Sequence, residues 1–295
     1  MFKLQGVVPP MITPFMENGD LDIKNLEKLL DFLKERVNGL YICGSYGSGP
    51  MMNVEERKQV AEVCVRLVNG KIPIIAHTGS TNTRDTVELT KHAEKIGCDG
   101  AAAVGPYYFH HKEDALIEFY GSMLEAVDKN FPIYLYHNIK FSGYEIPLRT
   151  IKTLKDKGLH GIKDATFDIL THATYQRELG GEGFDVVLGT EAMWLSARAL
   201  GAEAYIPGLG NVFPEICGKM WKEGMAGEFD ACRKTQFEVN RLRDVMYLAR
   251  STQLAVYAML EIRGVVNAFP RSPFVSATAE EKESIRKALD SMGML

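Results

Sequence analysis

The chain alternates short apolar segments with longer amphipathic segments over most of its length, and this alternation restricts the possible folds more than any other feature. Short runs of β-branched or small residues, separated by stretches with apolar residues every three or four positions, are typical of βαβ units on a parallel sheet. Eight runs are predicted strands: 6–12, 39–43, 72–76, 100–104, 133–136, 161–163, 186–189 and 204–206. Predicted helices between them include 23–36, 54–68, 83–96, 113–129 and 147–156.

The number of predicted strands selects between the two common parallel architectures. Eight strands alternating with helices within residues 1–210 favour a closed (βα)8 TIM barrel over an open doubly wound sheet. After residue 210 the pattern contains helices only, predicted at 214–223, 228–249, 252–262 and 279–291. We therefore predict an α/β protein with a barrel core in residues 1–210 and a C-terminal helical appendage, residues 211–295, packed on the barrel.

Composition excludes several classes of function. The 295 residues include 34 basic and 38 acidic side chains, for a net charge of −4, and no basic tract that would bind nucleic acid is present. No apolar run is long enough to span a membrane, and the N-terminal segment lacks the pattern of a signal peptide. The five widely spaced cysteines are typical of free thiols in a reducing compartment. We expect a cytoplasmic enzyme.

Lys163 is the most informative single residue, because it ends the apolar strand 161–163. An amine held in an apolar environment loses hydration, which lowers its pKa and leaves it free to attack a carbonyl group. In a (βα)8 barrel the C-terminal ends of the strands carry the chemistry. Lys163 is thus a candidate Schiff-base nucleophile, and the alternative is a strand-end lysine that reaches solvent.

Two further strand ends carry polar groups. The glycine-rich turn 44–49 can expose backbone amides, and with the hydroxyls of Ser45 and Ser48 these would hold a carboxylate. A flexible loop is the alternative for this turn, and it lacks the lysine and the spacing of a nucleotide-binding loop. Tyr136 closes the fifth strand, where its phenol is expected either to relay protons or to be a buried structural group.

The histidines do not predict a metal site. His110 and His111 are adjacent and cannot both face one ion, whereas His77 and His137 close separate strands without an acidic partner at a suitable spacing. The Gly47-Ser48-Gly49 string also lacks the strand–helix context of a hydrolase nucleophile. We expect neither a metal nor a hydrolase serine.

Taken together, these residues resemble the N-acetylneuraminate lyase and dihydrodipicolinate synthase family of pyruvate-dependent class I aldolases. The similarity runs from the opening Gly6-Val7-Val8-Pro9-Pro10 to Arg271-Ser272-Pro273, and Gly161-Ile162-Lys163-Asp164 resembles the Schiff-base strand of the family. The resemblance implies that Lys163 forms the imine, so that no other cofactor is needed. It also implies that Tyr136 relays protons and that Ser45 binds the pyruvate carboxylate and relays protons. Tyr108 is implied to be lent by a neighbouring subunit of a homodimer or homotetramer.

Several positions depart from the family pattern, and they bear on the substrate. Ser48 stands where the turn usually ends in glutamate, and Tyr46 replaces a small hydroxyl residue. Phe141 aligns with the arginine with which dihydrodipicolinate synthases hold the carboxylate of their second substrate. Glu191, followed by Ala192, retains half of the acidic pair that sialic acid lyases use for sugar hydroxyls. His137 and Lys140 are expected either to contact a polar substrate or to be solvated.

The expected function is a Schiff-base lyase or aldolase that cleaves or forms a 2-oxo acid, such as a 2-oxo-3-deoxy sugar acid or a sialic-acid-like compound, with pyruvate as one partner. The alternatives are a Schiff-base dehydratase or deaminase and a 4-hydroxy-tetrahydrodipicolinate synthase, followed by a non-catalytic oxo-acid sensor. The sequence leaves the aldehyde and the direction of the reaction open. Substrate contacts are predicted for Tyr46, Gly47, Ser48, His137, Phe141, Glu191 and Pro207.

Overall fold

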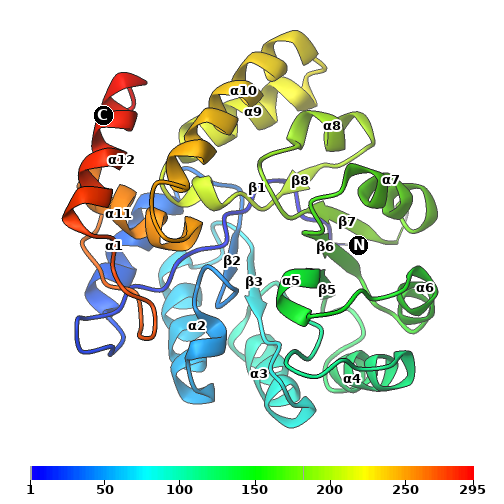
Figure 1. The fold of residues 1–295 in the computed structure, drawn as a ribbon. Helices are drawn as coiled ribbons and strands as arrows, with labels where there is room; N and C mark the ends of the chain where they lie inside the picture. The colour runs from blue at the N-terminus through cyan, green and yellow to red at the C-terminus, as the bar shows by residue number, and fades with distance from the viewer. Residues whose placement is uncertain (1, 182) are drawn as a thin grey trace.

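Eight parallel strands form one sheet in the computed structural model, which describes residues 2–181 and 183–295. Neighbouring strands follow the order β1-β8-β7-β6-β5-β4-β3-β2. A parallel bridge between Pro10 and Tyr41 joins the segment after β1 to β2 and closes the barrel. Helices surround the strands, which confirms the predicted (βα)8 architecture (Figure 1). The strands are β1 (Gly6–Val7), β2 (Leu40–Ile42), β3 (Ile74–His77), β4 (Gly100–Val104), β5 (Ile133–His137), β6 (Gly161–Asp164), β7 (Asp185–Leu188) and β8 (Ala204–Tyr205).

The first strand is shorter than predicted because two prolines follow it. Pro9 and Pro10 have no N–H to donate to a ladder, so regular pairing stops at Val7. The chain still reaches β2, since the Tyr41 N–H donates to the Pro9 carbonyl at 3.1 Å and the Met11 N–H donates to the Tyr41 carbonyl at 3.0 Å. The barrel is thereby closed without a long first strand.

Helices α2 and α3 begin and end where the sequence predicts, whereas α1 and α4 end three and four residues earlier than predicted. Asn53 and Glu56 form a capping box at the start of α2, and Asn82 caps α3, which ends at Gly97 with a φ of 90°. The helices of the barrel are α1 (Ile23–Leu33), α2 (Val54–Val68), α3 (Thr83–Ile96), α4 (Glu113–Glu125), α5 (Ile139–Ser142), α6 (Leu148–Asp156), α7 (Ile169–Glu178) and α8 (Trp194–Ala199), with short 3₁₀ turns η1 (Gly49–Met51) and η2 (Gly208–Asn211).

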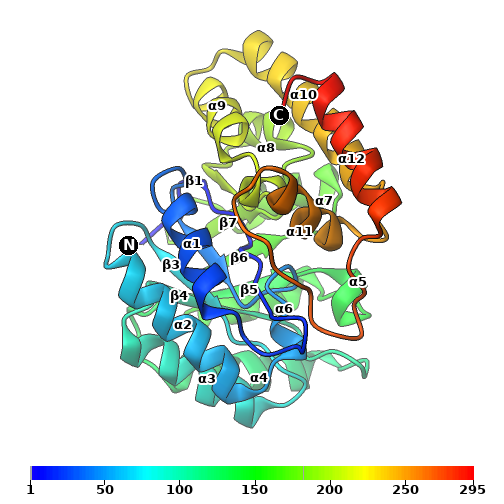
Figure 2. The same cartoon turned by 90° about the vertical axis from the view of Figure 1, so that its left-hand side faces the viewer.

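The C-terminal segment consists of α9 (Pro214–Met225), α10 (Phe229–Met246), α11 (Thr252–Ile262) and α12 (Ala279–Ser291), as the pattern predicts. Figures 1 and 2 show α10, α11 and α12 together on one side of the barrel. One apolar core joins Tyr205 of β8 with Cys217 of α9, Val239 of α10 and Leu260 of α11. The helices therefore pack on the barrel through a shared core, and the division at residue 210 stays a prediction.

Buried side chains fill part of the interior of the barrel. Val8, Tyr41, Tyr134 and Val187 belong to a buried cluster inside the ring of strands. The Tyr134 hydroxyl donates to the Asp185 carboxylate at 2.9 Å, which satisfies both buried polar groups. Within the described residues, no helix is long and apolar enough to cross a membrane.

Candidate active site

The amine of Lys163 lies inside the barrel between two aromatic rings. Its Nζ is 3.8 Å from the centre of the Tyr41 ring and 4.0 Å from the centre of the Tyr136 ring, and the side chain is 4% exposed. Burial lowers the pKa of Lys163 to about 7, so a large fraction of the amine is neutral near neutral pH. Because aromatic faces attract cations, the two rings would also stabilise the iminium ion formed from this amine.

Tyr136 lies next to Lys163 in the barrel because the two residues pair across β5 and β6. Burial raises the pKa of the Tyr136 phenol, while hydrogen bonds with Ser45 and Asn138 act in the opposite direction. The Asn138 amide donates to the phenol oxygen at 3.1 Å. Lys163, Tyr136 and Ser45 line one cavity, as their positions at strand ends predict.

The glycine-rich turn lies too close to neighbouring backbone for larger residues at two of its positions. A side chain at Gly49 would collide with the Cys43 carbonyl, and one at Gly47 would come within 2.9 Å of the Met11 carbonyl. Ser48 adopts a left-handed backbone conformation with a φ of 54°. The close approach to the Met11 and Cys43 backbone therefore requires glycine at positions 47 and 49.

Side chains of the turn bind the C-terminal helices. The Gln253 amide of α11 donates to the Ser48 hydroxyl at 2.8 Å and to the Tyr46 carbonyl at 3.0 Å. The Tyr46 hydroxyl donates to Thr252 at 2.9 Å. Ser48 in place of the usual glutamate thus has a partner in Gln253, and Tyr46 extends toward the start of α11.

The cavity around Lys163 has a volume of about 350 Å³ and opens at the C-terminal ends of the strands. Of the predicted site residues, the structure brings Lys163, Tyr136, Ser45, Tyr46, Phe141 and Glu191 together around it. Ser48 instead lines an adjoining cavity of about 260 Å³, which it shares with Ser45 and Phe141. Gly47 and Pro207 line neither cavity, although Gly208 beside Pro207 does line the larger one.

Glu191 lines the cavity and is paired with other groups of the protein. The carboxylate is 1% exposed, and it accepts hydrogen bonds from the Gly208 N–H at 3.0 Å and from the Arg243 guanidinium at 2.6 Å. Each of its two oxygens has one of these donors. The charge of Glu191 is therefore paired within the protein, while each oxygen can still accept a further hydrogen bond in the cavity that Glu191 lines.

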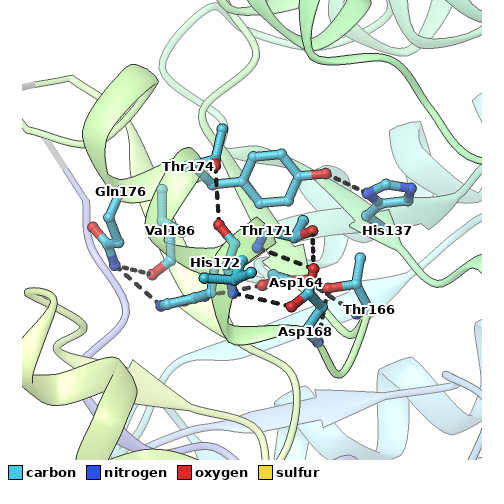
Figure 3. Close-up of polar contacts among 11 residues, drawn as sticks. His137, Asp164, Thr166, Asp168, Thr171, His172, Thr174, Gln176 and Val186 are labelled. Atoms are coloured by element: carbon cyan, nitrogen blue, oxygen red, sulfur yellow. Dashed lines mark hydrogen bonds and ion pairs between the residues drawn. The ribbon is translucent and has the colours of Figure 1, made fainter.

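His137 faces away from the cavity, in contrast to the predicted substrate contact. Successive strand residues point to opposite sides, so an inward Tyr136 requires an outward His137. The His137 ring accepts a hydrogen bond from the Ile146 N–H at 3.2 Å and lies 2.7 Å from the Tyr175 hydroxyl of α7 (Figure 3). Burial lowers the pKa of His137, which keeps the ring neutral. Its role is to fix β5 against α7.

A second outward group supports the strand that carries the lysine. The Asp164 carboxylate lies 2.9 Å from Nδ1 of the buried His172, and it accepts hydrogen bonds from the Thr166 N–H and hydroxyl (Figure 3). His172 is also 3.4 Å from the Gln176 amide. These contacts join the end of β6 to α7 directly behind Lys163.

Tyr108 does not reach the amine of its own chain. Its side chain is 84% exposed, its φ is 83°, and its ring packs edge-on against Phe109 with ring centres 4.9 Å apart. The neighbouring Tyr107 lines the smaller cavity. Within one chain, Tyr108 is separate from the other predicted catalytic residues.

Several residues around the amine and its cavity were not predicted, among them Tyr41, Asn138, Arg243 and Arg250. Tyr41 lies in the middle of β2. The alternation of inward and outward side chains along the strand was the only sequence signal that Tyr41 faces inward. Arg243 and Arg250 come from the C-terminal helices, for which the sequence pattern gives no position relative to the barrel. Among the described residues, no group of three or more His, Cys, Asp or Glu side chains is placed to hold a metal ion.

A buried lysine beside a tyrosine at the open end of a (βα)8 barrel defines a class I aldolase or lyase. The chain belongs to the dihydrodipicolinate synthetase family, whose model matches residues 3–292. Enzymes of this family work through a Schiff base on a lysine and need no external cofactor.

The comparisons include both synthases and an aldolase. The chain is 30% identical to the 4-hydroxy-tetrahydrodipicolinate synthase of Bartonella quintana, over 99% of each chain. The crystal structure of dihydrodipicolinate synthase from Aquifex aeolicus superposes with a TM-score of 0.92 at 28% identity, over 99% of each chain. The sialic acid aldolase of Ruminococcus gnavus gives a TM-score of 0.92 at 26% identity, over 98% of this chain and 97% of that one.

Proposed function

We propose that the chain condenses a 2-oxo acid, held as an imine on Lys163, with an aldehyde, as a 4-hydroxy-tetrahydrodipicolinate synthase does. The observation that carries this proposal is the Lys163 amine, buried between Tyr41 and Tyr136 at the floor of the cavity, with its pKa lowered to about 7. The synthase relatives support it over cleavage of a sialic-acid-like compound.

The proposed reaction begins when the neutral Lys163 amine attacks the keto carbon of pyruvate. Protonation of the resulting hydroxyl and loss of water give the iminium ion, whose positive charge faces the Tyr41 and Tyr136 rings. Loss of a methyl proton then gives an enamine, and its carbon attacks the aldehyde. The new alkoxide takes up a proton, and hydrolysis of the imine returns the free lysine.

We assign the proton transfers of this reaction to Tyr136, supported by Ser45. Tyr136 is next to Lys163 across the strands, and its hydroxyl oxygen is oriented by the donating amide of Asn138. The backbone amides of the turn 44–49 are proposed to hold the pyruvate carboxylate. Tyr108 is assigned to the site of a neighbouring subunit, supported by its exposed ring, in a homodimer or homotetramer.

A lyase acting on a 2-oxo-3-deoxy acid is the second candidate, and Phe141 favours it. This residue lines the cavity where the resemblance to dihydrodipicolinate synthases leads us to expect an arginine.

We also propose a cytoplasmic location, supported by the five cysteines, which are all free and buried.

Borohydride trapping of pyruvate tests the imine. We expect mass spectrometry to find a reduced pyruvate adduct on the wild-type chain and none on Lys163→Ala. Lys157→Ala is the matched control, since it removes an exposed lysine at the end of α6, and it should carry the adduct. An adduct on Lys163→Ala, or none on the wild type, would refute the proposal.

Product analysis separates the two candidate functions. With pyruvate and aspartate 4-semialdehyde, which together hold the carbons of the synthase product, a synthase consumes pyruvate. With 2-oxo-3-deoxygluconate, a lyase releases it. Consumption of the first pair without cleavage of the second compound supports the synthase, and the reverse result supports the lyase.

A further inference from the structure

His77 lies in the wall of the active site, and the proposed reaction gives it no role. It is the last residue of β3, and Ile75 of the same strand belongs to the cluster inside the barrel, so the alternation directs His77 inward as well. The residue is 3% exposed, and it lines the smaller cavity together with Ser45. A buried histidine at such a place either exchanges protons or holds other groups in position.

The ring nitrogens of His77 are engaged with the backbone of the two neighbouring strands. Nε2 accepts a hydrogen bond from the Val104 N–H of β4 at 3.1 Å, so the proton of the neutral ring is on Nδ1. The ring also forms a hydrogen bond with the backbone of Cys43, directly after β2. Burial, together with the charges of Arg57 and Lys163, holds the pKa of His77 well below its usual value. The ring therefore remains neutral, and it has no free nitrogen with which to exchange a proton.

Arg57 of α2 fixes the backbone that carries this ring. The buried guanidinium donates to the His77 carbonyl at 2.6 Å and to the Gly79 carbonyl at 3.0 Å. These two hydrogen bonds join α2 to the end of β3 and to the segment that follows it. His77 is thus held both at its backbone and at its ring.

The fixed ring packs against the two tyrosines that flank the amine. The His77 ring meets the Tyr136 ring edge-on, with ring centres 6.0 Å apart and an angle of 87° between the ring planes. The centre of the Tyr41 ring is 6.1 Å from each of these two rings. Nζ of Lys163 lies against both tyrosines. Because edge-to-face contacts between such rings are favourable, His77 restricts the rotation of the Tyr136 ring.

We propose that His77 is a positioning residue, whose ring holds the Tyr136 phenol in the orientation from which it exchanges protons with the imine on Lys163. This inference rests on the proposed function, because it concerns the proton transfers assigned to Tyr136. A rotation of the Tyr136 side chain would move its hydroxyl away from the reacting carbon, and proton transfer requires hydrogen-bond distance. His77 therefore contributes to the proton transfers and not to the formation of the imine.

Two measurements on pyruvate alone separate these steps. Borohydride trapping counts the sites that form the imine, and deuterium exchange at the methyl group reports the proton transfers. The rate of exchange is expressed per trapped site, so that unfolded chains do not contribute to it.

The variants either remove the ring of His77 or keep a ring in its place. In His77→Asn and His77→Gln, which both lack the ring, we expect kcat for exchange per trapped site to fall about tenfold, with KM for pyruvate within about twofold of the wild-type value. His77→Phe keeps a ring beside Tyr136, and its rate should stay within about threefold of the wild-type rate. A purely structural role would lower the number of trapped sites without lowering the rate at each site.

His160→Asn is the matched control. The His160 ring packs against Tyr134, with ring centres 5.6 Å apart, and it donates a hydrogen bond to the Phe2 carbonyl. It precedes β6, at the opposite end of the strand from Lys163, so its exchange rate per trapped site should equal that of the wild type.

Four outcomes overturn the proposal while trapping persists. They are an undiminished rate in the variants without the ring, an equal loss in His77→Phe, an equal loss in His160→Asn, and no exchange in the wild type. Loss of trapping in the wild type overturns the proposed function itself.

Discussion

At the scale of single residues, the buried amine of Lys163 predicts an unusual pH dependence of the rate of imine formation. Imine formation requires the neutral amine, and burial lowers the pKa of Lys163 to about 7 from its usual 10.5. We expect the rate of pyruvate trapping at saturating cyanoborohydride to rise with pH through pH 7 and to level off above about pH 8. A solvated lysine would instead continue to gain about tenfold per pH unit up to pH 10.

The same measurement on a reference amine provides the control. Free N-α-acetyl-lysine with pyruvate should show the steep rise over the whole range. If the protein follows the free amine between pH 8 and pH 9, the desolvated state of Lys163 is refuted.

Residues at strand ends could be predicted from the sequence because a barrel places them at one opening. Lys163, Tyr136 and Ser45 follow directly from this rule, and all three line the cavity. His137 shows where the rule fails, because the last residue of a strand faces inward or outward according to the alternation. In strands buried on both sides, such as β5, the hydrophobic pattern does not distinguish the two faces.

At the scale of elements, the contact between β6 and α7 predicts a structural role for His172. His172→Ala would leave the buried Asp164 carboxylate without its imidazole partner, 2.9 Å away, although Thr166 remains. We expect a loss of about 3 kcal/mol in the free energy of unfolding, measured with urea. Thr174→Ala on the exposed face of the same helix should cost less than about 0.5 kcal/mol. Equal losses in the two variants would show that the Asp164–His172 contact does not stabilise β6.

Capped helices with a clear period could be predicted to the residue, and weakly patterned ones could not. α2, α3, α11 and α12 begin and end where their caps and apolar spacing indicate. α8 has only six residues, too few to show a helical period, and it is not among the predicted helices. α7 was also not identified, although its N-cap Asp168 accepts hydrogen bonds from the first turn. Its position depends partly on the contact of Tyr175 with His137 of β5, which lies far from it in the sequence.

At the scale of the whole molecule, the barrel was predictable from the count of βα units, whereas the position of the C-terminal helices was not. Helical periodicity shows that α10 and α11 have an apolar face, but many packing positions would bury it. Their actual position brings Arg243, Tyr247 and Arg250 to the open end of the barrel. The residues that distinguish this pocket therefore come from the segment whose sequence pattern is least specific.

The assignment of Tyr108 to a neighbouring subunit predicts complementation between two inactive chains. Lys163→Ala retains Tyr108, and Tyr108→Phe retains Lys163, so a mixed dimer contains one site with both groups. Random co-assembly of equal amounts should restore about a quarter of the wild-type rate of deuterium exchange at the methyl group of pyruvate. This exchange requires the imine and proton transfer but no aldehyde.

Lys163→Ala mixed with Tyr136→Phe is the matched control. Tyr136 and Lys163 belong to one chain's cavity, so no mixed site is complete. Recovery in the control, or none in the first mixture despite formation of mixed dimers, would place the function of Tyr108 outside a shared site. Recovery in the first mixture alone would mean that the catalytic unit is the oligomer, since the exposed Tyr108 of one chain would then act on the imine of another.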